Sequence, residues 1–141
     1  MESKTDKALA RFGPFDCAPA VLAAWCEDYG LDTATALKLT CGLAAGMSRL
    51  GHTCGAVSGA YLVIGLKYGK CHADDAATKE KTFALVQEFE KRFLARHGAT
   101  NCRDLIELDL RHTDKTEAMV KIQKICPGVI RTTVEILEDI L

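Results

Sequence analysis

Apolar residues recur every three or four positions along most of the chain, which is the spacing of one face of an α-helix. The first such segment is residues 17–30, where Pro19 suits a first helical turn and Gly30 suits a C-terminal stop. The clearest amphipathic segment is residues 74–98, with a charged outer face and Gly98 at its end. The pattern predicts further helices over residues 32–51, 53–69, 101–108, 113–125 and 126–141.

No segment shows a sustained two-residue alternation of apolar and polar positions. Residues 128–137 contain β-branched side chains, but their apolar spacing fits a helix better than a strand. A length of 141 residues suits one domain with a real hydrophobic core. The sequence therefore predicts an all-α, single-domain helical bundle over residues 1–141.

Glycines repeat at intervals of four in the middle of the chain: Gly42 and Gly46, then Gly51, Gly55 and Gly59. A glycine inside a helix costs about 1 kcal/mol relative to alanine, so the spacing needs a reason. Residues four apart share a helix face, and glycines there let a second backbone approach closely. The favoured interpretation is close helix packing, and the alternative is a bulky cofactor laid against that face.

Composition and charge exclude some partners. A net charge of −1 and the lack of a basic stripe with interleaved aromatics argue against nucleic-acid binding and against an anionic membrane surface. The longest apolar stretch, residues 55–66, contains three glycines and is too short to span a bilayer, so we expect no membrane insertion. The first residues lack an apolar signal region, and we therefore expect a cytoplasmic location.

The seven cysteines stand out in such a chain, because structural disulfides are rare in the cytoplasm. Metal binding or redox chemistry is one interpretation, and buried cysteines acting as small hydrophobes is the other. Four cysteines lie at or near predicted helix starts: Cys17, Cys54, Cys102 and Cys126. The others lie inside predicted helices or in a loop: Cys26, Cys41 and Cys71.

A helix N-terminus is a chemically suitable place for a sulfur. Its unpaired N–H groups and partial positive charge stabilise a thiolate, which is the form that attacks and that binds metals. Four such sulfurs would suit an anionic cluster or a pair of reactive thiols. Their spacing, C-x36-C-x47-C-x23-C, matches no standard zinc or ferredoxin pattern, so the fold would have to assemble the site.

Three segments carry a family resemblance: "FDCAPAVLAAW", "CGAVSGA" followed by "GLKYG", and "ICPGVIRTTVEILEDIL". They resemble the C-GCAxxG-C-C family of redox-active proteins. The resemblance covers nearly the whole chain and implies four family cysteines, Cys17, Cys54, Cys102 and Cys126. The family is related to split-Soret cytochromes, which bind haem through C-x-x-C-H, and this chain has no such motif. Pro19 also departs from the glutamine of many relatives, and Cys26, Cys41 and Cys71 are additional.

The leading hypothesis is a redox protein in which these four cysteines converge on one site and hold a metal centre, first of all an iron–sulfur cluster. Four thiolates and the Cys126-Pro127 dipeptide, a pairing found in bacterial ferredoxin motifs, favour the cluster. Tetrahedral zinc has the same number of ligands. His52, two residues before Cys54, would be a fifth ligand or proton carrier, although a surface or capping role is the commoner one for such a histidine.

Two other hypotheses stay open. The first is a metal-free thiol–disulfide protein with Cys54 as nucleophile, its pKa lowered by the helix dipole, and Cys17, Cys102 or Cys126 as the resolving thiol. The second is a structural or partner-binding helical domain with buried cysteines. The sequence names no redox partner, and its small-residue faces would serve a homodimer as well as an intrachain helix pair.

Overall fold

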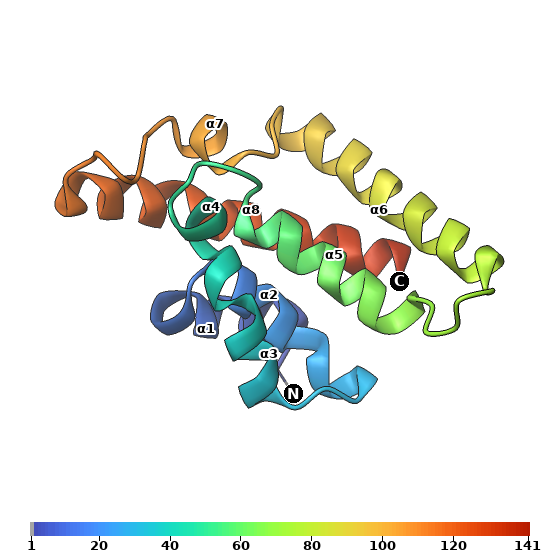
Figure 1. The fold of residues 1–141 in the computed structure, drawn as a ribbon. Coiled ribbons are helices and arrows are strands. Elements are labelled where there is room, and N and C mark those ends of the chain that lie inside the picture. The colour runs from blue at the N-terminus through green and yellow to red at the C-terminus, as the bar shows by residue number, and fades with distance from the viewer. Residues whose placement is uncertain (1) are drawn as a thin grey trace.

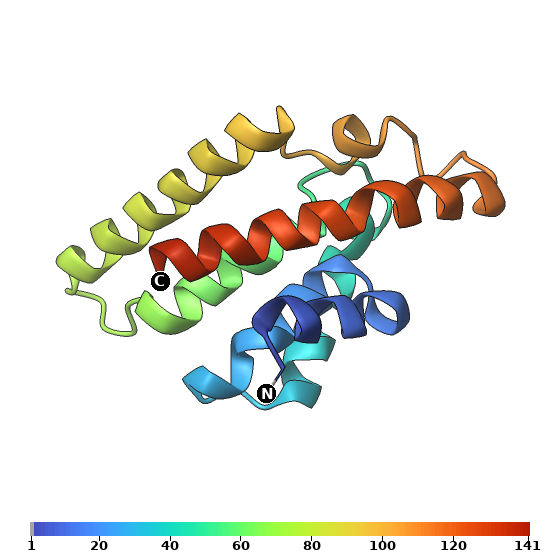
Figure 2. The same cartoon turned by 180° about the vertical axis from the view of Figure 1, so that it is seen from behind.

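The computed structural model describes residues 2–141 and is all-helical over that range, as the sequence predicts. Its α-helices are α1 (Lys4–Phe15), α2 (Cys17–Trp25), α3 (Thr33–Thr40), α4 (Ala44–Ser48), α5 (Gly55–Tyr68), α6 (Ala76–His97), α7 (Cys102–Ile106) and α8 (Lys115–Ile140). Two short 3₁₀ turns, η1 (Cys26–Tyr29) and η2 (Cys41–Leu43), follow α2 and α3. Helices α5 and α8 run through the middle, with α6 on one side and α1 to α3 on the other (Figures 1 and 2).

Helix α1 is absent from the sequence prediction, although its signals are present. Ser3 accepts a hydrogen bond from the backbone of Asp6, and the Asp6 side chain accepts one from the Ser3 backbone, which forms a capping box. Ala8 and Phe12, four residues apart, are buried against the core. A capping residue followed by apolar positions at helical spacing was the available signal.

The core lies where α6 and α8 pack against α5 and α2. Phe89 and Phe93 of α6 are fully buried and stacked, with ring centroids 5.9 Å apart, and α8 supplies Ile130 and Leu137. The amphipathic character predicted for residues 74–98 is confirmed at these two buried phenylalanines, while Phe83 of the same helix is exposed. Gly98 ends α6 in the left-handed conformation, as the sequence predicts, and the Asp75 side chain caps its start.

The predicted small-residue face is confirmed in α5. A Cβ atom on Gly59 would stand 3.0 Å from the backbone oxygen of Ala18, and one on Gly55 would overlap the Cys17 sulfur. The same prediction is wrong for Gly42 and Gly46. Gly42 has open space around it, and Gly46 has a φ of +67° and so belongs to no right-handed helix face.

The predicted continuous helix over residues 32–51 is also wrong. Helix α3 ends at Thr40, η2 follows, and five consecutive residues from Ala45 to Arg49 then have positive φ. The segment labelled α4 is therefore largely a left-handed turn, closed by the hydrogen bond from the Arg49 N–H to the Ala45 oxygen at 2.9 Å. Gly51, with a φ of +79°, also lies outside any helix.

The two helices predicted for residues 113–141 form one helix, α8. Pro127 has no N–H to give to the carbonyl of Gln123, so proline at this position usually kinks or breaks a helix. Here the helix continues, with Ala118 buried before the proline and Val129 and Ile130 buried after it. Cys126 therefore lies inside a helix, and the prediction that it begins one is wrong.

The outermost part of α8 extends past α1 and α4 at one end of the molecule (Figures 1 and 2). Met119 and Val120 on this part are 55% and 65% exposed. Within residues 2–141, none of the helices combines the length and the apolar character needed to cross a membrane.

Candidate four-cysteine site

One cavity brings together the four cysteines that the sequence singles out. Four cysteines line it, three from helices α2, α7 and α8 and one from the residue just before α5: Cys17, Cys102, Cys126 and Cys54. Cys54 and Cys102 are buried, and Cys17 and Cys126 are half-buried. These residues are separated by up to 109 positions in the sequence and converge only through the fold.

Three of the four cysteines lie at helix starts. Cys17 is the first residue of α2, Cys54 is the N-cap of α5, and Cys102 is the first residue of α7. Backbone N–H groups near the start of each helix have no intrahelical partner and can point to a sulfur. The sequence-based grouping by helix start therefore holds for three cysteines, whereas Cys126 reaches the cavity from the middle of α8.

Backbone hydrogen bonds join the loop segment before Cys54 to the loop segment before Cys102. The Cys54 N–H donates to the Thr100 oxygen and the Cys102 N–H donates to the His52 oxygen, both at 2.7 Å. Between these bonds, Thr53 and Asn101 form an isolated antiparallel bridge. The segments before α5 and before α7 thus run side by side, and this pairing fixes both cysteines at the cavity.

The left-handed turn closes another side of the cavity. Ala45 lines the cavity, and Gly46 packs so closely on Cys102 that an added Cβ would overlap the Cys102 Cβ and stand 3.1 Å from its sulfur. The His52 N–H donates to the Gly46 oxygen at 3.0 Å, which joins the turn to the Cys54 segment. A non-glycine residue in this conformation costs about 1–2 kcal/mol, so the turn is strained.

Apolar side chains form most of the remaining wall. The cavity encloses about 40 Å³. Its larger apolar lining residues are Phe12, Leu105, Ile106, Leu110, Ile122, Ile125, Val129 and Ile130. The only charged residue that lines it, within residues 2–141, is Asp16, which is exposed and lies at the rim. The four sulfurs therefore face a medium of low polarity.

Burial dominates the acidity of these thiols. It raises the pKa of Cys102 to about 11 and the pKa of Cys126 to about 12, and nearby Cys17 adds to both shifts. Burial also raises the pKa of Cys17, while the backbone N–H groups of Ala45 and Ala18 act in the opposite direction. The expected lowering of the Cys54 pKa is wrong, because burial raises it strongly and outweighs the N–H groups of Val57 and Ala56.

The remaining candidates lie outside the cavity. Cys26 is buried beside the Ala23 carbonyl and Thr33, while Cys41 and Cys71 are exposed. The side chain of His52 is exposed and does not line the cavity, so the structure does not support a ligand role for it. What His52 contributes is its backbone, which accepts the hydrogen bond from Cys102.

Sequence reasoning missed three residues of the site: Asp16, Ala45 and Gly46. Asp16 precedes a predicted helix, a common place for a capping aspartate, and its position next to Cys17 was the available signal. The spacing of Gly46 predicts a helix face, whereas its backbone is left-handed. Ala45 carried no signal, because alanine does not favour the left-handed conformation.

As the side chains lie, no three His, Cys, Asp or Glu residues between positions 2 and 141 are close enough to hold one metal ion. All seven cysteines are free thiols.

A family model matches most of the chain. It is described as "Putative redox-active protein (C_GCAxxG_C_C)" and matches residues 15–140, a span that contains all seven cysteines. Neither the curated proteins nor the solved structures contain a match to the chain.

Proposed function

Since this chain belongs to the C-GCAxxG-C-C family of redox-active proteins, we propose that Cys17, Cys54, Cys102 and Cys126 together hold a metal centre, an iron–sulfur cluster, through which the protein carries electrons. The observation that carries the proposal is the convergence of these four cysteines, from four separate parts of the chain, on one apolar cavity. Four cysteine thiolates are the usual ligand set of such clusters.

The shape of the site supports a bound group. Gly46 and Gly55 lack side chains at the points where a Cβ would overlap Cys102 and Cys17, so these sulfurs keep the space beside them. Within residues 2–141, the side chains that line the cavity offer no competing oxygen or nitrogen ligand other than the Asp16 carboxylate. A donor set of four sulfurs in a water-poor cavity fits iron, and it fits zinc by the number of ligands.

The negative charges of four thiolates would favour a cation in the cavity. Four thiolates in one apolar cavity would repel each other and lose their hydration, which is costly without a compensating positive charge. Metal ions supply that charge, and their binding releases the thiol protons. The thiol side chains must also turn towards a common centre on binding, because as placed no three of them reach one ion.

The chain's own residues would then shape the centre. The backbone N–H groups of Ala45 and Ala18 act on the Cys17 sulfur, and those of Val57 and Ala56 act on Cys54. Hydrogen bonds to ligand sulfurs and exclusion of water are two means by which proteins set the potential of a cluster. When bound, the cluster would supply one-electron oxidation and reduction.

A second candidate function is metal-free thiol–disulfide exchange. It is favoured by the position of Cys17, which lines the same cavity as the other three cysteines. Two thiols would give up two electrons and two protons to a small disulfide such as oxidised glutathione, which leaves as two thiols. Half-buried Cys17 suits the attacking role better than Cys54, which is buried.

Anaerobic reconstitution with iron and sulfide tests the first proposal. We expect a brown protein whose visible absorption, iron and sulfide are all lost when any one of the four cavity cysteines is changed to serine. Matched controls are Cys26→Ser, Cys41→Ser and Cys71→Ser, which remove cysteines outside the cavity and should leave the loading unchanged.

Two other results would overturn the proposal of an iron–sulfur cluster. A colourless protein with about one zinc per chain, bound by the same four residues, would identify a structural or storage site. A colourless, metal-free protein in which oxidised glutathione converts two cavity thiols to a disulfide would establish the second function.

A further inference from the structure

One wall of the cysteine cavity is a short surface turn, residues 44–50, which we call the flap. It lies between α2 and α7, as Figure 1 shows for the segment labelled α4. On its inner side Ala45 lines the cavity, and the backbone of Gly46 packs on Cys102. The outer residues of the flap are exposed: Ser48, Arg49 and Leu50. The flap is therefore the layer that separates Cys102 from solvent on this side.

Few contacts hold the flap in place. In the described part of the chain, every hydrogen bond that it makes to or from an oxygen stays within residues 42–52. One of these bonds, from the His52 N–H to the Gly46 oxygen at 3.0 Å, joins it to the segment before Cys54. Across residues 41–53, no side chain larger than that of alanine is buried in the hydrophobic core. The flap can therefore leave the cavity without disturbing the core.

The backbone of the flap conflicts with its sequence. Four of its non-glycine residues have a φ between 56° and 69°: Ala45, Met47, Ser48 and Arg49. Residues of these types favour negative φ, and the apolar spacing over residues 32–51 predicts a right-handed helix. Packing against the cavity imposes one conformation while the local sequence prefers another. Such a conflict is typical of segments that switch between two arrangements.

The closed flap also restricts what the site can hold. The cavity encloses about 40 Å³, which is space for about three water molecules. Between positions 2 and 141, no three ligand side chains lie close enough to hold one metal ion, so the thiols have to turn before they can share one. Cys102 is restricted on the flap side, where even a Cβ atom on Gly46 would overlap the Cys102 Cβ. Movement of the flap would release Cys102.

We propose that the flap is a gate to the four-cysteine site. It covers Cys102 in its strained left-handed form, and it opens when its residues return to negative φ and the bond between His52 and Gly46 breaks. The motion itself is independent of what the site binds. That the open form admits iron and sulfide to the four thiols is a second part, which rests on the proposed function.

Hydrogen exchange in metal-free protein tests the motion, with the His52 N–H as the reporter because it bonds to the flap. Gly46→Ala places a methyl group on Cys102 in the closed form only, so we expect the His52 amide to exchange at least about tenfold faster. Ala45→Gly relieves strain in the closed form, so exchange should become about three- to tenfold slower. Exchange of the Cys54 amide, which bonds to Thr100 instead, should not change in either variant.

Gly65→Ala is the matched control, because it makes the same change on α5 at a position with open space around it, and His52 exchange should stay within about twofold. NMR relaxation dispersion on the wild type gives a second measurement on the millisecond timescale. We expect exchange at residues 45–49 with a minor state whose Cα shifts are those of negative φ. This measurement needs no variant, so it decides the matter even if Gly46→Ala does not fold.

The rate of iron and sulfide uptake tests the second part. If the gate must open before the thiols are reached, uptake should be faster in Gly46→Ala and slower in Ala45→Gly, by the same factors as the exchange of the His52 amide. The rate is measured from the growth of visible absorption, and the final amount bound should be equal in both variants and the wild type.

The outcomes keep the two proposals apart. If His52 exchange responds to neither variant and residues 45–49 show no dispersion, the flap does not move and the inference is wrong, whether or not a centre forms. If exchange responds but no metal binds to the wild type, the proposed function fails and the motion of the flap stands. Altered exchange with unchanged rates of uptake would overturn the second part alone.

Discussion

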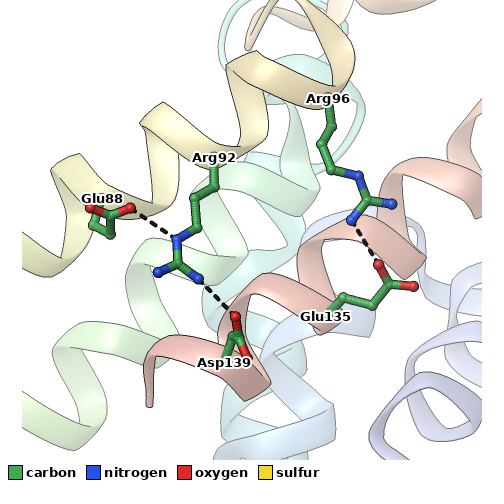
Figure 3. A network of polar contacts seen from close by, with 5 residues as sticks. All are labelled: Glu88, Arg92, Arg96, Glu135 and Asp139. Carbon is green, nitrogen blue, oxygen red and sulfur yellow. Dashed lines mark hydrogen bonds and ion pairs between the residues drawn. The ribbon is translucent and has the colours of Figure 1, made fainter.

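The middle and the C-terminal part of helix α8 belong to two different kinds of structure. Near Cys126 the helix forms part of a cavity with strained backbone, close glycine contacts and four free thiols. About 20 Å further along, it packs on α6 through buried aliphatic and aromatic side chains, with ion pairs on the outside. Figure 3 shows this outer layer, in which Arg92 bridges Glu88 and Asp139 while Arg96 reaches Glu135.

Regular packing holds the molecule together at the α6 end, whereas the cavity end maintains features that oppose stability. The left-handed turn, the strained Asp16 and the crowded sulfurs all cost free energy and survive only because the surrounding helices fix them. Proteins commonly concentrate strain at functional sites and stability elsewhere. The comparison therefore predicts that equivalent substitutions have unequal effects at the two ends.

The largest expected effect comes from two glycines of the same helix. In Gly55→Ala the new methyl group would overlap the Cys17 sulfur, and we expect a loss of about 3 kcal/mol in unfolding free energy. Gly65→Ala is the matched control, because open space surrounds that position and alanine should add about 0.5–1 kcal/mol. Urea denaturation measures both, and equal stabilities would show that α2 and α5 are not in close contact at Gly55.

The thiols provide the next largest contrast. With its pKa raised to about 11 by burial, Cys102 holds about one thiolate per thousand molecules at pH 8, so we expect it to react with iodoacetamide at least about a hundredfold more slowly than exposed Cys41 and Cys71. Peptide mapping after timed alkylation of metal-free protein measures the rates. Equal rates at all sites would show that the cavity is open to solvent.

The raised pKa of Cys102 also makes the free energy of unfolding depend on pH. An unfolded cysteine loses its proton near pH 8.5, whereas native Cys102 keeps it to about pH 11. Between these values the native state binds more protons, so the free energy of unfolding should fall as pH rises above about 8.5. Stability that stays constant up to pH 10.5 would contradict the burial of these thiols.

The regular end was largely predictable from the sequence, for physical reasons. In α6 the apolar period, the Asp75 cap and the Gly98 stop all act within a few residues, so the local pattern determines the element. Helix α5 was found in the same way. The sequence also singles out the four cysteines that line one cavity, although the family resemblance contributes to that choice.

The cavity end was less predictable, because its backbone depends on tertiary contacts. The left-handed turn has no signal in the local sequence. Four of its residues are of types that do not favour positive φ: Ala45, Met47, Ser48 and Arg49. Pro127 locally favours a helix break, and packing on both sides of it overrides that preference. The raised pKa of Cys54 likewise reflects burial, which the position of a cysteine at a helix start does not reveal.

Helix caps give a smaller and more direct test. Asp114 accepts two backbone N–H groups at the start of α8, from Thr116 and Glu117, so Asp114→Ala should cost about 1 kcal/mol. Asp16→Ala removes an aspartate from the same kind of position but loses no capping bond and keeps a strained backbone, so the change should stay within about 0.5 kcal/mol. Thermal unfolding measures both, and a comparable loss in the two variants would show that Asp16 also caps its helix.

The smallest effect is expected for the ion pairs of the regular end. Arg96 and Glu135 are about half exposed, with a distance of 2.7 Å between Nη1 and Oε2, and exposed pairs of this kind contribute about 0.2–1 kcal/mol. A double-mutant cycle with Arg96→Ala and Glu135→Ala should therefore give a coupling energy below 1 kcal/mol that shrinks as salt is raised. A coupling that is larger and insensitive to salt would mean that the outer layer of α6 and α8 is a main source of stability. The buried aromatic and aliphatic contacts beneath it would then account for less of the difference between the middle and the C-terminal part of α8.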